Sequence, residues 1–144
     1  MADPGQSGGA PLVIPSITGG QVERLAPGDR FTLALASGEK VAGGQLVELT
    51  GDFECQEAGD ESEVCVGVAL HDADADGEFK KVSVAAEGVW NLKDSGSGVS
   101  AGETVVCAAS GEIKALDGDD FNQAVGIALA DIGAGATGPV KLRL

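Results

Sequence analysis

The stretch that decides the fold is Val64-Cys65-Val66-Gly67-Val68-Ala69-Leu70, which leads into His71-Asp72-Ala73-Asp74-Ala75-Asp76-Gly77. Large apolar residues stand at every second position of the first stretch, and small residues stand between them. A β-strand with one bulky face and one thin face has this period of two. The acidic run that follows ends in glycine and is typical of a turn. The sequence therefore predicts a strand that leaves through a tight acidic turn.

The same phrase returns 59 positions later, where Val125-Gly126-Ile127-Ala128-Leu129-Ala130-Asp131 echoes Val66–Asp72. Each copy follows a shorter predicted strand that begins with glycine and a polar residue, at 44–47 and at 102–105. Each copy also leads through a turn into a closing strand, at 80–84 and at 139–144. The order of these features predicts a unit of about three strands that occurs twice. The alternative is the general self-similarity of a small β protein.

Length and composition set limits on the class of protein. The chain has 144 residues, enough for one domain with its own core, and its 3% of aromatic residues predicts a core of Val, Leu, Ile and Ala. Its 23 glycines indicate many tight turns. The formal net charge of −14 disfavours nucleic acid and anionic membranes as partners, because both are bound through Lys and Arg.

Short apolar stretches separated by turn signals about every 8 to 12 residues predict an all-β fold, a small and mostly antiparallel barrel or sandwich. No long helix is expected, because glycine, proline and β-branched residues are frequent. We expect an extended N-terminal arm over residues 1–20 and a single β domain over residues 21–144, since the arm is rich in proline and glycine. The expected strands are Phe31–Leu35, Val41–Leu49, Val64–Leu70, Phe79–Ala86, Glu87–Leu92, Thr104–Ala108 and the two that close the chain, with residues 113–121 irregular.

The sequence contains no arrangement typical of catalysis. Its one histidine, His71, stands at a predicted strand end, where a solvated or capping role is the simpler interpretation. The glycine runs lack the helix and the Lys-Ser/Thr pair of a phosphate-binding loop, and the cysteines lack zinc spacing. We therefore predict a protein that is not an enzyme and has no cofactor. No apolar stretch has the length of a membrane span, and the N-terminus lacks signal-peptide features, so synthesis in the cytoplasm is expected.

The acidic run leaves two interpretations open. Asp72, Asp74, Asp76 and Gly77 copy the first half of a calcium-binding loop, whereas Ser83 occupies the position of the bidentate glutamate. The run is therefore either a weak calcium site or a solvated acidic turn.

The cysteines also leave two interpretations open. Cys55 and Cys65 flank a predicted hairpin tip and could face each other across it. The alternative is that each is a small buried apolar residue, as is usual for cysteines in a cytoplasmic product.

A series of short motifs follows a fixed order over about residues 22–144. The motifs are Ala26-Pro27-Gly28-Asp29, Val41-Ala42-Gly43-Gly44-Gln45-Leu46-Val47, Val66-Gly67-Val68-Ala69, Glu87-Gly88-Val89-Trp90-Asn91-Leu92, Ser100-Ala101-Gly102-Glu103-Thr104-Val105, Val125-Gly126-Ile127-Ala128 and Val140-Lys141-Leu142-Arg143-Leu144. This order resembles the tailed-phage capsid decoration, or cement, proteins of the DUF2190-like family. The chain departs from them by an acidic insertion, Asp52–Glu63, and by a longer N-terminal arm.

The resemblance implies a structural virion protein of a bacteriophage. Such proteins bind the major capsid protein on the outside of an icosahedral head, commonly as homotrimers, and stabilise the capsid against DNA pressure. The implied location is the capsid exterior, after synthesis in the host cytoplasm. A soluble β-sandwich module that binds glycans or calcium is the alternative, although sugar-binding platforms need exposed aromatic residues and this chain has one Trp and no Tyr.

Two parts of the chain are candidate contacts to the capsid or to a neighbouring protomer. The stretch 11–18 is apolar and extended, and its prolines exclude it from the interior of a sheet, so we expect a strap laid on a partner or a segment packed on its own domain. Trp90 is the second candidate, either as an anchor of a trimer contact or as plain core packing. The candidate residues are Pro11, Leu12, Val13, Ile14, Pro15, Ile17 and Trp90.

Overall fold

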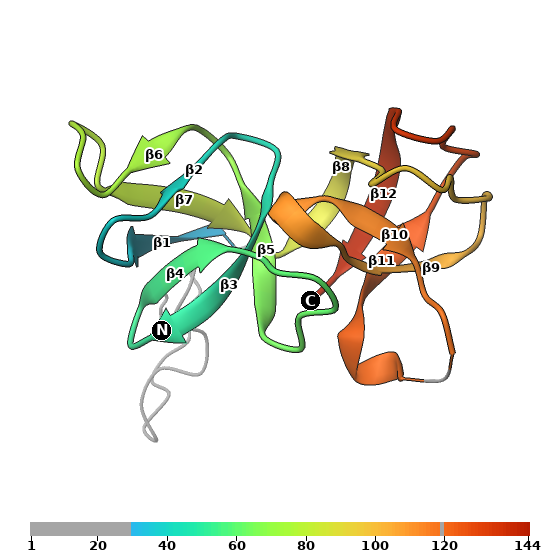
Figure 1. The fold of residues 1–144 in the computed structure, drawn as a ribbon, viewed down its shortest axis with the longest axis horizontal. Helices are drawn as coiled ribbons and strands as arrows, with labels where there is room; N and C mark the ends of the chain where they lie inside the picture. Colours follow the sequence, from blue (N-terminus) through green and yellow to red (C-terminus); the bar gives the residue numbers. More distant parts are fainter. Residues whose placement is uncertain (1–29, 119) are drawn as a thin grey trace, which may run out of the picture.

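The computed structural model describes residues 30–118 and 120–144, and over these residues the chain is an all-β protein (Figure 1). The predicted fold class is therefore confirmed. Two three-residue 3₁₀ turns, η1 (Ala109–Gly111) and η2 (Phe121–Gln123), are the helical elements of this part of the chain, and neither could cross a membrane. The strands are β1 (Arg30–Leu35), β2 (Lys40–Val41), β3 (Leu46–Gly51), β4 (Glu54–Glu57), β5 (Cys65–Ala69), β6 (Ala73–Asp74), β7 (Lys81–Ala85), β8 (Glu87–Lys93), β9 (Thr104–Cys107), β10 (Ile113–Ala115), β11 (Ala124–Ala128) and β12 (Thr137–Arg143).

The strands form two units that lie side by side (Figure 1). The first, barrel 1, is a closed sheet with the order β1-β4-β3-β5-β7. The second, barrel 2, is a sheet with the order β10-β9-β11-β12-β8, whose two outer strands approach each other through a parallel bridge between Asp94 and Ile113. The strand pairs of both barrels are antiparallel except β1–β4, as expected from the sequence.

The two barrels repeat each other strand for strand. When β5 is aligned with β11, the neighbours β3, β4, β7 and β1 align with β9, β10, β12 and β8. The small β2–β6 pair, which joins Val41 to Ala73, corresponds to the bridge between Val99 and Ile132. The predicted internal repeat is present, and it contains five strands instead of about three.

Buried side chains form two apolar clusters. One fills barrel 1, and the other fills barrel 2 and extends onto the outside of barrel 1. Both consist of aliphatic residues and cysteine, as the composition predicted. The first contains Leu33, Leu35, Val41, Val47, Cys55, Ala69, Ala73, Val82 and Val84; the second contains Leu46, Ala58, Val68, Ala85, Leu92, Val99, Val105, Cys107, Ile113, Val125, Ala128, Ile132, Val140 and Leu142.

The structure divides one predicted strand in two and contains two strands that were not predicted. The expected strand Val41–Leu49 is split into β2 and β3, because Gly44 has a positive φ of 94° and turns the chain. The acidic residues after β3 include β4, which has a single fully buried residue, Cys55, and therefore lacks an apolar signature. The expected irregular stretch 113–121 begins with the three-residue strand β10.

The proposed facing of Cys55 and Cys65 is also wrong. Cys55 lies on β4 and Cys65 on β5, and β3 runs between these two strands in barrel 1. Both cysteines are free thiols, as is Cys107. Cys55 is buried inside barrel 1, which is the alternative that the sequence left open, and burial raises the pKa of its thiol to about 11.

Candidate interaction surfaces

The contact between the barrels is built on a row of neighbouring residues on the outside of barrel 1. This outer row of barrel 1 consists of Leu46, Val68, Ala85 and Arg30, which pair in this order across β3, β5, β7 and β1. Side chains alternate along a strand, so the row faces away from the barrel interior. Its three apolar members are nonetheless buried, because they join the apolar cluster of barrel 2.

Barrel 2 meets this row with one of its ends. The end carries the turn between β9 and β10, and we call it the hairpin end. The Gly111 N–H donates to the Ala58 carbonyl oxygen at 3.0 Å, and the Glu61 N–H donates to the Cys107 carbonyl oxygen at 2.9 Å. A Cβ on Gly111 would lie 2.9 Å from the Leu46 carbonyl oxygen, so the turn is seated directly on β3. Figure 1 shows η1 against barrel 1 at this point.

Trp90 lies at the same hairpin end and completes the contact. The Arg30 guanidinium of the outer row stands 5.8 Å from the centroid of the Trp90 ring, a cation–π arrangement. The indole N–H donates to the Glu87 carbonyl oxygen at 2.7 Å, and a Cβ on Gly88 would lie 3.0 Å from the indole nitrogen. Gly88 thus leaves room for the ring. Trp90 is partly buried against the apolar cluster that the two barrels share.

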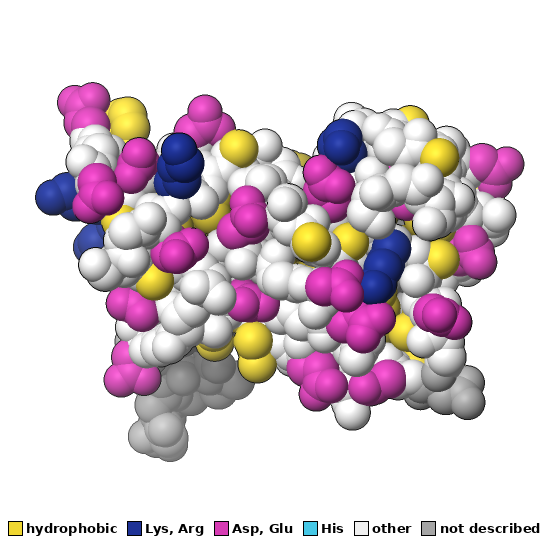
Figure 2. Space-filling view, viewed as in Figure 1, with side chains coloured by type: hydrophobic (Ala, Val, Ile, Leu, Met, Phe, Trp, Pro, Cys, Tyr) yellow, Lys and Arg dark blue, Asp and Glu magenta, His cyan; other side chains and the backbone are white. Residues whose placement is uncertain are grey.

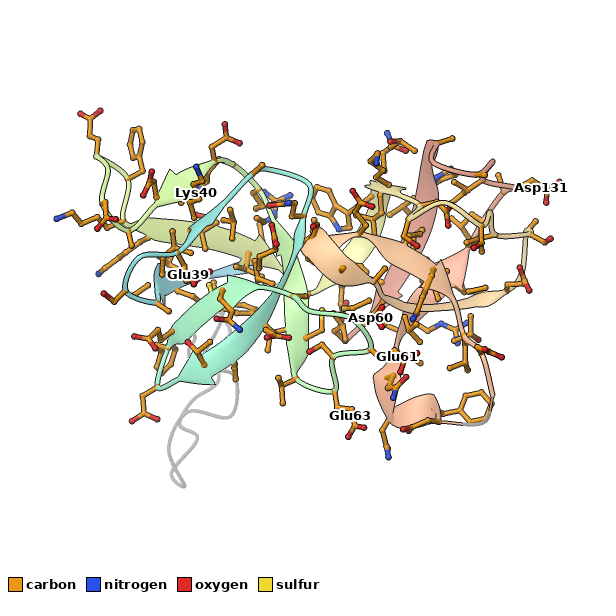
Figure 3. All side chains as sticks on the ribbon, viewed as in Figure 1. Glu39, Lys40, Asp60, Glu61, Glu63 and Asp131 are labelled. Atoms are coloured by element: carbon orange, nitrogen blue, oxygen red, sulfur yellow. The ribbon has the colours of Figure 1, made fainter. Side chains whose placement is uncertain are left out.

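The acidic connection between β4 and β5 adds polar contacts between the barrels. Lys114 of β10 lies 2.9 Å from Asp60 and 3.0 Å from Glu61, and these hydrogen bonds raise the pKa of Lys114. Figure 3 shows Asp60 and Glu61 where the two barrels meet, with Glu63 farther along the same connection. The sequence pointed to this stretch only as an acidic insertion, yet it is part of the contact.

Within barrel 1, Glu48 holds the start of that connection. Its carboxylate accepts hydrogen bonds from the Gln56 amide at 2.7 Å and from the Gly59 N–H at 3.1 Å. Burial raises the pKa of Glu48, but hydrogen bonds from Gln56, Ser62 and Gly59 outweigh burial and lower it overall. In barrel 2 the aligned residue is the buried, apolar Val106.

Among residues 30–118 and 120–144, no element packs on the corresponding hairpin end of barrel 1. It consists of Phe31 and Val66, which are half-buried, together with Leu49 and Val64, which are 42% and 53% exposed. The Leu49 N–H donates to the Val64 carbonyl oxygen, so these two exposed residues are neighbours. Phe31 aligns with Trp90, and Leu49 aligns with the buried Cys107.

The corresponding outer row of barrel 2 is more exposed within the described residues. Thr104, Ile127, Lys141 and Val89 pair in this order across β9, β11, β12 and β8. Thr104 and Ile127 are half-buried, Lys141 is exposed, and Val89 is 55% exposed. The outer row of barrel 2 therefore has the same position in its sheet as the outer row of barrel 1, but its residues are less buried.

A buried carboxylate distinguishes the loops of barrel 2. Asp94 is fully buried, and its Oδ2 accepts hydrogen bonds from the N–H groups of Gly96, Gly98 and Gly135 at 2.8, 2.9 and 3.1 Å. Burial raises the pKa of Asp94, but the backbone donors outweigh burial and lower it overall. Asp94 occupies the position of Leu35 in barrel 1 and ties two glycine-rich loops together.

His71 supports the backbone around the acidic run. Its Nε2 accepts a hydrogen bond from the Ser83 N–H at 3.1 Å, and its Nδ1 lies 2.9 Å from the Asp72 carbonyl oxygen. These contacts are those of a capping residue, the role that the sequence analysis favoured over a catalytic one.

The acidic carboxylates form turn contacts. Asp72 accepts from the Gly43 N–H at 2.8 Å, and Asp131 makes the same contact with the Ala101 N–H in barrel 2. Asp74 accepts from the Asp76 N–H at 2.9 Å. Among the described residues, no three His, Cys, Asp or Glu side chains gather as metal ligands. The turn contact that Asp72 makes in barrel 1 is thus repeated by Asp131 in barrel 2.

Hollows and many acidic side chains mark the surface of the described residues. A hollow of about 480 Å³ lies beside β2 and β6 and is lined by apolar and charged residues, among them Val41, Phe79 and Lys40. A second hollow, of about 290 Å³, lies where barrel 2 meets barrel 1, beside Gln45 and Lys93. Figure 2 shows Asp and Glu distributed over both barrels, with Lys and Arg at few points.

The predicted contact residues of the arm, Pro11, Leu12, Val13, Ile14, Pro15 and Ile17, lie outside the described residues. The structure places Trp90 between the two barrels of one chain. Sequence reasoning did not single out the two outer rows or the two hairpin ends. The repeat relates each surface of barrel 1 to one of barrel 2, but this relation requires all five strands to be known.

The described part of the chain is a duplicated β-barrel with neighbouring exposed apolar residues, a surface feature typical of interaction sites. Comparison with protein families specifies the class of protein: the phage cement protein family matches residues 25–144, and the chain belongs to this family. The match spans both barrels. No curated protein matches the sequence.

A solved structure shares the fold. It is the crystal structure of the head fiber gp8.5 N base in bacteriophage phi29, which superimposes with a TM-score of 0.60 and 20% sequence identity. The superposition covers 79% of this chain and 92% of that one, so both barrels take part. At this identity the likeness concerns the fold.

Proposed function

We propose that this protein decorates the outside of an icosahedral phage head and stabilises the capsid against DNA pressure. The family match over residues 25–144 carries the proposal. The likeness to the base of a head fiber supports a place on the head, since both proteins have a double barrel of the same fold. The role is structural and involves no catalytic step.

The partner in this proposal is the major capsid protein, and the working form is a homotrimer. A trimer presents each contact surface three times, so individually weak contacts to several capsid subunits add through multivalency. A bound trimer can thereby connect capsid subunits that would otherwise separate under pressure.

The N-terminal stretch 11–18 is proposed as the strap that reaches the capsid or the adjacent protomer. Its apolar residues and its two prolines suit an extended segment that lies on a partner.

The direct test is binding to purified heads that lack this protein. Full-length protein should co-sediment with the heads, saturate at a fixed number of copies per head, and raise the temperature at which packaged heads release DNA. Protein that stays in the supernatant at all concentrations contradicts the proposal. Deletion of residues 1–18 should lower the occupancy, and unchanged occupancy would remove the arm from the binding site.

A further inference from the structure

We propose that copies of this chain associate head to tail: the hairpin end of barrel 1 in one copy docks on the outer row of barrel 2 in the next. This inference deepens the proposed function, because it supplies the contact that would build the trimer. Its basis is the internal repeat, since the chain already contains one contact of this kind between its own two barrels.

The internal contact is heterologous, because it joins two different surfaces of the repeated unit. Barrel 2 contributes its hairpin end, with Trp90 and Gly111, and barrel 1 contributes its outer row, with Arg30 and Leu46. A heterologous contact leaves one copy of each surface unused: the hairpin end of barrel 1 and the outer row of barrel 2.

In the described part of the chain, both unused surfaces carry exposed apolar residues. Leu49 and Val64 at the hairpin end and Val89 in the outer row are about half exposed, whereas Cys107, the counterpart of Leu49 in the internal contact, is buried. Neighbouring exposed apolar residues on a protein surface are typical of interaction sites.

The charges of the unused surfaces are complementary. The hairpin end of barrel 1 is acidic, with Asp52 and Glu54 at its turn and Glu63 beside Val64. The outer row of barrel 2 carries Lys141, while Arg143 on the same side of β12 stands opposite Glu87 of β8. Opposite charges at the two surfaces favour one orientation of docking, which is notable in a chain of net charge −14.

The differences from the internal contact agree with a contact between separate chains. Lys141 replaces Ala85 and Thr104 replaces Leu46, so the second row is more polar. Such a row can remain in water before assembly, whereas the first is permanently covered. A heterologous contact forms a ring if its rotation closes, and three copies would give a ring of six barrels joined by three internal and three intermolecular contacts.

The experiment uses two variants of the full chain, each with one damaged surface. Leu49→Asp damages the hairpin end of barrel 1 and Ile127→Asp damages the outer row of barrel 2. Sedimentation velocity at protein concentrations up to about 1 mM should give a mass of three times 14.3 kDa for the unmodified chain and the mass of a single chain for each variant. A mixture of the two variants retains one good surface of each kind and should form a dimer that does not grow.

Controls separate folding from association. Phe79→Asp alters an exposed aromatic residue in the hollow beside β2 and β6, outside both surfaces, and should remain trimeric. Lys141→Glu, at an exposed position, should weaken the trimer without loss of thermal stability, so the test does not depend on Ile127→Asp folding. An unmodified chain that stays monomeric, an Ile127→Asp variant that associates like the unmodified chain, or a polymer without limit would overturn the ring.

Binding to heads distinguishes this inference from the proposed function. A monomer that still saturates the heads would refute the ring and leave the decoration role intact. A trimer that never binds heads would refute the decoration role and leave the ring intact.

Discussion

Barrel 1 and barrel 2 have the same strand order and nearly the same register, yet their matching outer rows differ in burial. Leu46, Val68 and Ala85 are buried on barrel 1, whereas Lys141, the counterpart of Ala85, is exposed on barrel 2. The strand pairing is the same in the two barrels, whereas the residues of the outer rows differ in type and in burial. The comparison teaches that after duplication the strand pairing was kept and that the residues diverged where each unit meets a different neighbour.

The interiors diverged in a coordinated way. Ala73 and Val82 fill one site in barrel 1, and Ile132 and Gly138 take the matching positions in barrel 2. A Cβ on Gly138 would lie 2.6 Å from Cγ1 of Ile132, so the larger residue in one strand requires the smaller residue in the next. Volume is conserved while the residues that supply it change, as expected for a closely packed interior.

The largest effect is expected when barrel 1 is given the residue of barrel 2. Ala85→Lys places an ammonium group in the contact between the barrels, where Ala85 is fully buried. The cost should exceed about 3 kcal/mol, because a buried charge without a partner is among the most destabilising changes. Chemical denaturation measures the loss.

The matched control is the reverse change, Lys141→Ala, at an exposed position. It should alter the free energy of unfolding by less than about 0.5 kcal/mol. Equal losses for the two variants would mean that the outer rows do not differ in burial.

A second prediction concerns a feature that the barrels share. A Cβ on Gly67 or on Gly126 would lie 2.4 Å from a backbone carbonyl oxygen of the next strand. Gly67→Ala and Gly126→Ala should each cost about 1–3 kcal/mol, because the strands must separate. Thermal denaturation should show the same loss in both barrels, while Gly133→Ala, which meets only the Ala136 side chain at 3.8 Å, should be nearly neutral. A loss confined to one barrel would contradict the structural equivalence.

A third prediction concerns a feature that only barrel 2 has. Asp94→Asn removes the carboxylate that holds three glycine N–H groups and should cost about 1–3 kcal/mol at pH 7. The control Asp131→Asn, at an exposed carboxylate with one backbone contact, should cost less.

The lowered pKa of Asp94 predicts how the stability difference between the unmodified chain and Asp94→Asn changes with pH. The pKa of Asp94 is lowered in the folded protein, so its contribution is fully present above the unfolded value of about 3.9 and is lost as the pH falls through the folded value. The advantage of the unmodified chain over Asp94→Asn should therefore shrink below about pH 4. A difference that is constant from pH 7 to pH 3 would exclude the charge as its cause.

The sequence predicted the features that depend on local pattern. The period of two at Val64–Leu70 marks β5, and its echo at Val125–Asp131 marks β11, so the fold class and the repeat follow from local residues. Strands β4 and β10 could not be predicted, because each has a single fully buried residue and therefore shows no alternation of apolar residues, although each pairs with the strand just before it. The interpretation in which Cys55 faces Cys65 is wrong for another reason, because β3, a strand from earlier in the chain, lies between β4 and β5.

The surfaces were the least predictable part. Val68 and Ile127 are both apolar residues of alternating strands, and nothing local says that Val68 is fully buried and Ile127 only half-buried. That difference arises from the docking of barrel 2 on barrel 1. Trp90 was singled out because it is the only tryptophan, whereas its neighbour across the contact, Arg30, had no distinguishing signal.

The smallest effect is expected at the rim of the contact between the barrels. Lys114→Met removes the two ion pairs with Asp60 and Glu61, both of which are largely exposed, so the loss should be below about 1 kcal/mol. High salt screens exposed charges, and the Debye length falls to about 3 Å at 1 M. The difference between Lys114→Met and the unmodified chain should therefore vanish in denaturation curves recorded in concentrated NaCl. Lys93→Met, which removes a pair with Glu112 inside barrel 2, is the matched control and should show an equal or smaller loss with the same salt dependence. A loss of stability in Lys114→Met that persists in high salt would show that the aliphatic stem of Lys114 packs between the barrels. The acidic connection would then belong to the apolar contact and not to its polar rim.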